Sequence, residues 1–217
     1  MIKIKSLQVS EIKTISDTGS GEWWDKEWTT GFYKKPVEGA IYLGYEGFAK
    51  DDQADRRHHG GSDKAICVYS DDHREFWRKQ LGNFEHGAFG ENLTLVNACE
   101  ESVHVGDIYK IGEEVLVQVS QPRQPCWKLA RCWKIKDLTK QVELSGKTGF
   151  YFRVLNPGFV EAGQELQLIE RGEYSLAHCN EIRYRDKNNR EALLKLAYYP
   201  ALSASWKDSF LNSLVKI

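Results

Sequence analysis

The stretch GDIYKIGEEVLVQVS, residues 106–120, decides the class of fold. Residues 108–111 have the length of a strand, Gly112 and Glu113 suit a tight turn, and three valines then alternate with other residues over 115–119. Two such segments joined by a short turn are typical of an antiparallel hairpin, and the alternation places the valines on one face. The sequence therefore predicts a β-rich domain that contains this hairpin.

The first 170 residues largely continue this pattern. Apolar or alternating segments of strand length recur at residues 2–9, 40–48, 65–69, 92–96, 149–160 and 165–170. The regular helix–strand alternation of parallel α/β proteins is not present in the sequence. We therefore expect a mainly β fold, a mixed or antiparallel barrel.

Two short helices are expected to interrupt the barrel. In the first, residues 70–82, Ser70 is placed to cap the start and Gly82 to end it, with Phe76 and Trp77 directed toward a core. The second is expected to begin near Cys126. Its core-facing side would carry Leu129, Cys132 and Trp133.

The sequence becomes helical after residue 170. Ser175 is placed to cap one short helix, residues 189–199 are rich in helix formers, and Ser205 with Asp208 has the spacing of a capping box. We predict a barrel domain over residues 1–170 and a three-helix domain over residues 171–217. A segment as short as residues 171–217 could hardly fold alone, and its helices are therefore expected to dock on the barrel.

Composition narrows the class of protein. The chain has 217 residues, of which 41% are hydrophobic and 28% charged, with a formal net charge of -1. This balance predicts a globular protein and disfavours a polymer of nucleic acid or an acidic membrane as partner. The N-terminus carries no apolar leader, so a cytoplasmic protein is expected. The five cysteines are sparse and form no C-x-x-C pair, which indicates reduced thiols.

One cysteine stands out from the rest. In SQPRQPCWKLARC, residues 120–132, two prolines precede Cys126, and Arg123 and Lys128 place positive charge on either side of it. Cations and a helix start favour the thiolate, which can be a nucleophile or a ligand for a soft metal. Cys132 falls about two turns further along the helix and is expected to face the core. The remaining cysteines are interpreted as structural: Cys67, Cys99 and Cys179.

Two glycine-rich loops could hold an anion. In DDQADRRHHGGSDKA, residues 51–65, the side chains of Arg56, Arg57, His59 and Lys64 accompany a Gly-Gly pair. In HGAFGENLTL, residues 86–95, a special backbone angle at Gly90 could direct Glu91 and Asn92 into a pocket. Taken alone, each motif is better explained as a solvated turn.

Aromatic residues crowd residues 22–37. Three tryptophans, Phe32 and Tyr33 alternate there with lysines. Such a segment could be a lid that stacks on a planar substrate, or a loop fixed to the barrel by its tryptophans. The sequence leaves both interpretations open.

Taken together, four segments resemble the MOSC domain, the molybdenum-cofactor sulfurase C-terminal domain family. They are DDQADRRHHGGSDKAICVY, FGENLT, VGDIYKIG and VSQPRQPCWKL, in the family's order between about residues 51 and 129. The helical tail is similar to the three-helix extension of the YiiM subfamily. The resemblance thus extends over nearly the whole chain and implies a β-barrel-like domain followed by three helices.

The resemblance also implies a cofactor and its ligands. Cys126 would bind molybdenum in a molybdenum–molybdopterin cofactor, or carry sulfur for it. By position, the residues that would hold the pterin and its phosphate are His59, Gly60, Gly61, Lys64, Phe89, Gly90, Glu91, Asn92, Gln121 and Arg123. YiiM-like proteins are associated with reducing N-hydroxylated compounds such as hydroxylaminopurine.

These expectations define the functional hypotheses. The first is an oxidoreductase with Cys126 as molybdenum ligand and His59 or Glu91 as proton donor, a choice that the sequence does not make. The chain has no flavin, nicotinamide or ferredoxin-type motif, so electrons would come from a separate reductase. The second is a carrier of the cofactor or of sulfur, without turnover. A binder of single-stranded nucleic acid is disfavoured by the net charge and by the absence of a basic stripe.

Overall fold

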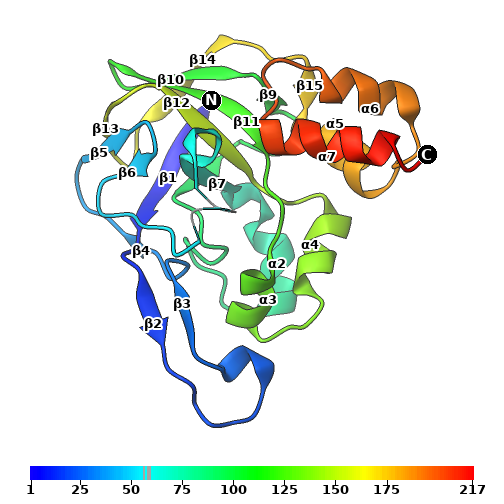
Figure 1. Ribbon diagram of the computed structural model, residues 1–217. Coiled ribbons are helices and arrows are strands. Elements are labelled where there is room, and N and C mark those ends of the chain that lie inside the picture. Colours follow the sequence, from blue (N-terminus) through cyan, green and yellow to red (C-terminus); the bar gives the residue numbers. More distant parts are fainter. Residues whose placement is uncertain (56, 58–59) are drawn as a thin grey trace.

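Seven strands close into a barrel (Figure 1). The structure is a computed structural model, and it describes all residues from 1 to 217 except 56, 58 and 59. The main sheet has the order β14-β10-β11-β12-β7-β8-β1-β4, and an additional pairing of β14 with β1 closes the ring. The seven strands of the ring are β1 (Ile2–Val9), β7 (Ile66–Ser70), β8 (Leu93–Val96), β10 (Ile108–Ile111), β11 (Val115–Pro122), β12 (Phe150–Asn156) and β14 (Glu165–Glu170).

The predicted hairpin is confirmed as β10–β11. Ile111 pairs with Val115, and Tyr109 pairs with Val117, in antiparallel register. The alternating valines of β11 are fully buried inside the barrel, which is why this stretch forms a strand with one apolar face. Among the strand pairs of the described residues only β7–β8 is parallel, so the expected mixed, mainly β barrel is confirmed.

Shorter strands decorate the barrel. They are β2 (Lys13–Ile15), β3 (Trp28–Thr30), β4 (Lys35–Pro36), β5 (Ile41–Gly44), β6 (Gly47–Phe48), β9 (His104–Val105), β13 (Gly158–Val160) and β15 (Tyr174–Ser175). The prediction of one strand over residues 40–48 is wrong. The chain turns back on itself between β5 and β6, with Gly47 at a positive φ of 136°, and the two halves pair with each other.

Three short helices cover a second apolar cluster beside the barrel: α2 (Arg74–Leu81), α3 (Trp127–Trp133) and α4 (Leu138–Ser145). The predicted signals of the first helix are confirmed, because Ser70 Oγ accepts a hydrogen bond from the Asp72 amide and Gly82 ends α2 at φ 75°. Trp77 is fully buried, as expected. Phe76 was predicted to face the core and is instead 46% exposed, because adjacent helical residues point about 100° apart.

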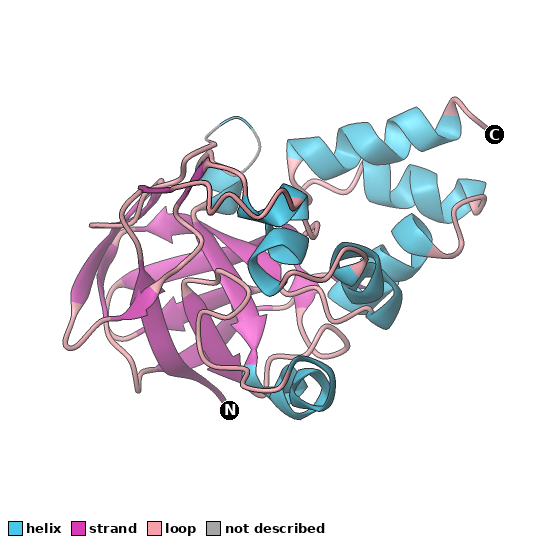
Figure 2. Cartoon of the chain, turned by 90° about the horizontal axis from the view of Figure 1, so that it is seen from below, coloured by secondary structure: helices cyan, strands magenta, loops and turns pink. Residues whose placement is uncertain are grey.

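The C-terminal helices are α5 (Leu176–Tyr184), α6 (Arg190–Ala197) and α7 (Ala204–Leu214). They gather on one side of the barrel strands (Figure 2). Their buried side chains, which include Trp206 and Phe210, belong to the same apolar cluster as the barrel interior. Ser175 caps α5 as predicted. The N-cap of α7 is Ser203, two residues before the predicted Ser205. The Ser203 hydroxyl accepts a hydrogen bond from the Trp206 amide. The boundary between a barrel domain and a three-helix domain at residue 170 stays a prediction.

Within the described part of the chain, no helix has both the length and the apolar composition needed to cross a membrane.

Two glycines with the same φ allow a test of the barrel's packing. Gly146 and Gly149 both have φ 72°, but a Cβ on Gly149 would lie 2.4 Å from the Val68 carbonyl oxygen, whereas a Cβ on Gly146 meets nothing within 4 Å. We expect Gly146→Ala to lower the free energy of unfolding by about 1 kcal/mol, the cost of a left-handed alanine. Gly149→Ala adds the clash and should cost about 3 kcal/mol or more.

The measurement is urea unfolding of both variants beside the unmodified protein. Equal losses for the two variants would contradict the close approach of Gly149 to strand β7.

Candidate functional site

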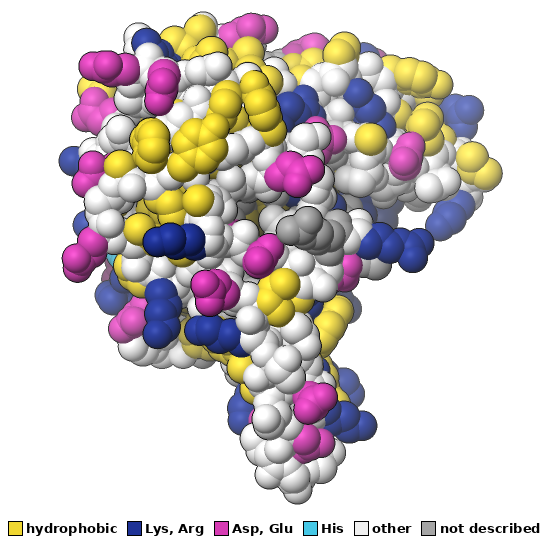
Figure 3. Space-filling view, turned by 60° about the vertical axis from the view of Figure 1, so that its left-hand side comes forward, with side chains coloured by type: hydrophobic (Ala, Val, Ile, Leu, Met, Phe, Trp, Pro, Cys, Tyr) yellow, Lys and Arg dark blue, Asp and Glu magenta, His cyan; other side chains and the backbone are white. Residues whose placement is uncertain are grey.

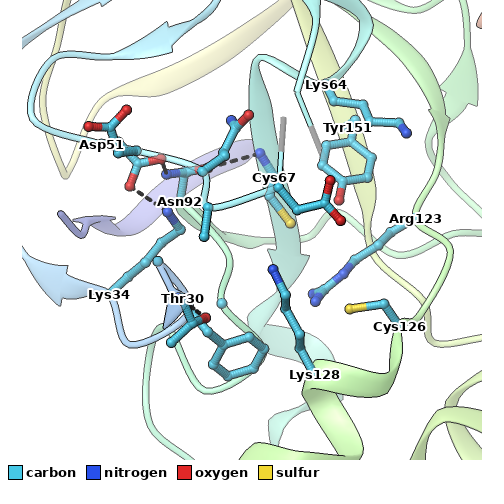
Figure 4. Close-up of a pocket in the computed structure, with 17 residues that line it drawn as sticks. Thr30, Lys34, Asp51, Lys64, Cys67, Asn92, Arg123, Cys126, Lys128 and Tyr151 are labelled. Carbon is cyan, nitrogen blue, oxygen red and sulfur yellow. Dashed lines mark hydrogen bonds and ion pairs between the residues drawn. The ribbon is translucent and has the colours of Figure 1, made fainter. Parts of the chain in front are cut away.

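A pocket opens where the starts of β7 and β12 and the end of β11 meet the segments that precede β4, follow β6 and precede β8 (Figure 4). Its lining contains sulfur, phenol, carboxylate and cationic groups but few aliphatic side chains. The charged, thiol and phenol side chains in it are Lys34, Asp51, Asp52, Asp55, Lys64, Cys67, Arg123, Cys126, Lys128 and Tyr151. Such a set suits a polar, anionic ligand.

Cys126 stands at the start of a helix, as predicted. Strand β11 ends at Pro122, and Cys126 is the N-cap of α3 with extended backbone angles, φ -117° and ψ 165°. Its carbonyl oxygen accepts from the Leu129 amide at 3.0 Å and from the Thr139 hydroxyl at 3.2 Å. The backbone of Cys126 is therefore fixed by α3 and α4, while its half-buried sulfur faces the pocket.

Arg123 brings a buried positive charge to the same place. The residue is 6% exposed, and its amide donates to the Gly149 carbonyl at 2.9 Å. Its Nη1 is buried and has no hydrogen-bond partner among the described residues. A buried guanidinium with an unsatisfied donor is costly to a protein unless a ligand completes it. This nitrogen is a donor that an anionic group in the pocket could satisfy.

Opposite Arg123, a buried ion pair holds the wall of the pocket (Figure 4). The Lys34 ammonium contacts Asp51 Oδ1, and both side chains are less than a tenth exposed. Asp51 also accepts from the Ser10 amide at 2.8 Å and from Asn92 Nδ2 at 2.9 Å. Asn92 in turn accepts from the Cys67 amide at 3.1 Å. This network joins the segment before β4, the segment after β6, the segment before β8, and strand β7.

Two pocket residues were missed by the sequence analysis. Cys67, interpreted there as structural, lines the pocket from β7, and Tyr151 lines it from the paired position on β12. Burial raises the pKa of the Cys67 thiol and of the Tyr151 phenol, so both keep their protons at neutral pH. Period-two alternation could have placed Cys67 and Tyr151 on one face only if the β7–β12 register had been known.

Lys64 lies at the rim, just before β7. Burial lowers the pKa of its ammonium below the ordinary value, although Asp63 and Asp55 oppose the shift. A nearby anion would favour the charged ammonium and oppose the effect of burial. The position of Lys64 at the rim is compatible with the predicted anion site.

The structure brings only part of the predicted set to this pocket. Lys64, Gly90, Asn92, Arg123 and Cys126 line it. Gly60 and Gly61 line an adjoining groove that shares Asp51 and Asp52 with the pocket. His59 lies outside the described residues.

Three predicted residues point elsewhere. The Glu91 carboxylate accepts from the amides of Gly87 and Phe89 and from the Thr94 hydroxyl, so it braces its own loop and is 1% exposed. Phe89 packs in the apolar cluster under α2. The Gln121 amide faces the C-terminal helices, where its oxygen accepts from Ser205 at 3.2 Å.

The tryptophan-rich segment forms one side of an arm, made of β2, β3 and the loop between them, that projects from the barrel at the bottom of Figure 1 and of Figure 3. Arg131 of α3 fixes its base: the guanidinium lies 4.7 Å from the Trp28 ring centre and 5.7 Å from that of Trp127, and donates to the carbonyls of Trp24 and Lys26. The arm returns to the pocket through Thr30 and Phe32. These contacts fit a loop fixed to the barrel by its tryptophans.

The donor set limits the kind of metal site that this pocket could form. Within the residues that the structure describes, no three histidine, cysteine, aspartate or glutamate side chains converge as a metal centre. A metal held here by Cys126 would need its remaining ligands from a bound cofactor.

Comparisons with known proteins agree with this architecture. The family model described as the MOSC domain matches residues 55–167, and the model described as the YiiM-like, 3-alpha helix domain matches residues 175–214. Protein YiiM of Escherichia coli (strain K12) is 34% identical over 178 residues, which are 80% of this chain and 79% of that protein. The crystal structure of YiiM from Geobacillus stearothermophilus is 41% identical, with a TM-score of 0.82 over 99% of this chain and all of that one.

A third relative is much longer. A protein named reductase from Gibberella moniliformis (strain M3125 / FGSC 7600) is 36% identical over 149 residues. The match takes in 67% of this chain but 26% of the reductase.

The buried Lys34–Asp51 ion pair beside the pocket should contribute more to the free energy of unfolding than an exposed ion pair does. We expect Lys34→Met to lower the free energy of unfolding by about 3–5 kcal/mol, because it leaves the Asp51 carboxylate buried without its cation. Lys34→Met combined with Asp51→Asn should recover part of that loss. Urea unfolding gives the values, and Lys195→Met, in the exposed pair with Glu191, is the control that should leave the midpoint unchanged. Similar midpoints for Lys34→Met and Lys195→Met would contradict a buried pair.

Proposed function

Because the chain belongs to the MOSC family, in its YiiM-like branch, we propose that it is a molybdenum-cofactor-dependent reductase of N-hydroxylated compounds. Cys126 is the proposed molybdenum ligand, and a separate reductase supplies electrons. The proposal extends the family assignment by naming the metal ligand, the class of substrate and the source of electrons.

The observation that carries the proposal is the buried Arg123 Nη1, which lacks a partner within the described part of the chain, beside the sulfur of Cys126. A molybdopterin cofactor is anionic through its phosphate and binds its metal through sulfur. A guanidinium suits the phosphate, and a thiolate suits a soft metal. The residues at the pocket therefore fit the group that the family implies.

Bound there, the cofactor would supply two electrons, which together with two protons convert an N–OH group to N–H and water. The chain's own residues have other tasks. Arg123, Lys64 and Lys128 line the side of the pocket from which an anion would be held. Their donors would orient the ligand relative to Cys126 before any substrate enters.

Protons for the reaction must come from groups that keep them in the pocket. Glu91, one of two proton donors considered from the sequence, is committed to its own loop. The Tyr151 hydroxyl lies in the pocket, and burial raises its pKa, so it carries its proton at neutral pH. A protonated phenol beside the substrate can donate a hydrogen bond to the hydroxyl oxygen that leaves.

The need for a partner has two supports. The sequence has no flavin, nicotinamide or ferredoxin-type motif. The relative named reductase matches this chain over only 26% of its own length, so it has additional sequence that this chain does not share. A cytoplasmic setting, where such a donor and small N-hydroxylated compounds would meet the protein, is part of the proposal.

Molybdenum retention tests the ligand. In protein from a molybdenum-replete host, we expect Cys126→Ser to lose most of its molybdenum, because the hydroxyl is a poor ligand for a soft metal. Cys132→Ser, six residues further along the same segment, is the matched control and should retain it. Elemental analysis per mole of protein gives the result, and full retention in Cys126→Ser would show that Cys126 does not hold the metal.

Turnover tests the reaction. With a reduced electron donor, the molybdenum-loaded protein should convert hydroxylaminopurine to aminopurine. Cys126→Ser should lower the rate by about a hundredfold or more, because loss of a group that only supports a metal ligand already costs about 10–100-fold. Product is followed by chromatography. A protein that keeps molybdenum but converts no substrate with several donors would instead be a carrier of the cofactor.

A further inference from the structure

The C-terminal helices contact three segments of the barrel, and each segment leads directly into a pocket residue. Two of the contacts come from the start of α7. The Ser203 amide donates to the Ser120 carbonyl at 3.0 Å, and the Ala204 amide donates to Asp63 Oδ2 at 3.4 Å. Asp63 immediately precedes Lys64, and Ser120 lies on the same segment as Arg123 and Cys126, ahead of both.

The third segment is held by α5. Asn180 Nδ2 donates to the Gly146 carbonyl at 3.2 Å and to the Thr148 hydroxyl at 2.9 Å. The chain continues to Gly149, whose carbonyl accepts from the Arg123 amide, and then to Tyr151. The same helix therefore fixes the turn on which the buried arginine rests.

Arg183 of α5 reaches closest to the cysteine along the chain. With the Gln124 amide turned so that its oxygen faces the guanidinium, that oxygen lies 2.5 Å from Nη2 and 3.2 Å from Nε. The guanidinium is itself positioned by the Trp206 ring, 4.8 Å from its centre, and by the Ser209 hydroxyl. Gln124 precedes Cys126 by two residues.

From these contacts we infer that the C-terminal helices act as a clamp on the pocket, in which Arg183 is the positioning residue for the Cys126 loop. Pro122 and Pro125 have no backbone amide hydrogen to donate, so the loop makes fewer backbone hydrogen bonds and the side-chain contact of Gln124 with Arg183 adds to those of Arg123 and Cys126. The role of the clamp in holding a metal ligand rests on the proposed function. The contact between the helices and the Cys126 loop is independent of that proposal.

The test measures how readily the loop opens. In protein with no added substrate or donor, the rate of Cys126 alkylation by iodoacetamide is followed by peptide mass spectrometry, together with hydrogen exchange over residues 120–128. Arg183→Met removes the hydrogen bonds of the guanidinium to Gln124 and to Ser209 and its contact with the Trp206 ring, and Gln124→Leu removes the first of these alone. We expect Cys126 to react roughly tenfold faster, the factor that corresponds to losing a hydrogen bond to a charged group.

Matched variants isolate the contact. Arg185→Met changes the exposed arginine at the C-cap of α5, which pairs with Glu181 and donates to the Leu144 carbonyl but does not contact the Cys126 loop, and should leave the Cys126 rate unchanged. Arg183→Lys should restore part of the slow Cys126 rate, since an ammonium can still donate to Gln124 but lacks the planar fork of the guanidinium. Gln124→Leu should reproduce the effect of Arg183→Met, and the double variant should add little to either, because both remove one interaction.

Cys179, fully buried in α5, reports whether the helices themselves have opened. Faster alkylation of Cys126 with Cys179 unchanged is the expected result. An unchanged Cys126 rate in both Arg183→Met and Gln124→Leu, or equal acceleration of Cys126 and Cys179, would overturn the clamp. Failure of the proposed function would appear separately, as absence of molybdenum or turnover in the unmodified protein.

Discussion

A buried guanidinium is the constraint on which the site depends. Arg123 is 94% withdrawn from water, and none of the described residues completes the hydrogen bonding of its Nη1. Transfer of such a donor out of water without a partner costs on the order of 1–3 kcal/mol, and more for a charged group. A fold that retains this arrangement gives up stability at a pocket, which is the usual signature of a place prepared for a ligand.

The rest of the architecture explains how that charge is held. Strand β11 is part of the barrel wall, with its valines buried in the interior. It ends at Pro122, so Arg123 follows directly. The Gly149 carbonyl fixes the arginine's backbone, and Gly149 can approach strand β7 so closely only because it has no side chain. Cys126 then begins α3, so one short segment presents a fixed cation and a sulfur to the same space.

Local patterns in the sequence predicted the parts of this structure that local physics determines. The β10–β11 hairpin, the Ser70 cap, the glycine at the end of α2 and the position of Cys126 at a helix start all depend on neighbours a few residues away. What the sequence could not provide was register between distant strands. Cys67 and Tyr151 face each other only because β7 pairs with β12, and Lys34 meets Asp51 only because the arm folds back. Glu91 shows the opposite error: its polar side chain suggested a pocket group, but the carboxylate turns to the amides of its own loop.

The central claim is that Cys126 places its sulfur on a metal brought by a cofactor. X-ray absorption at the molybdenum edge counts the sulfur atoms bound to the metal and measures this most directly. The account predicts one sulfur more in the unmodified protein than in whatever fraction of Cys126→Ser retains molybdenum, with no such difference for Cys132→Ser. The same number of sulfur ligands in all three proteins would contradict it.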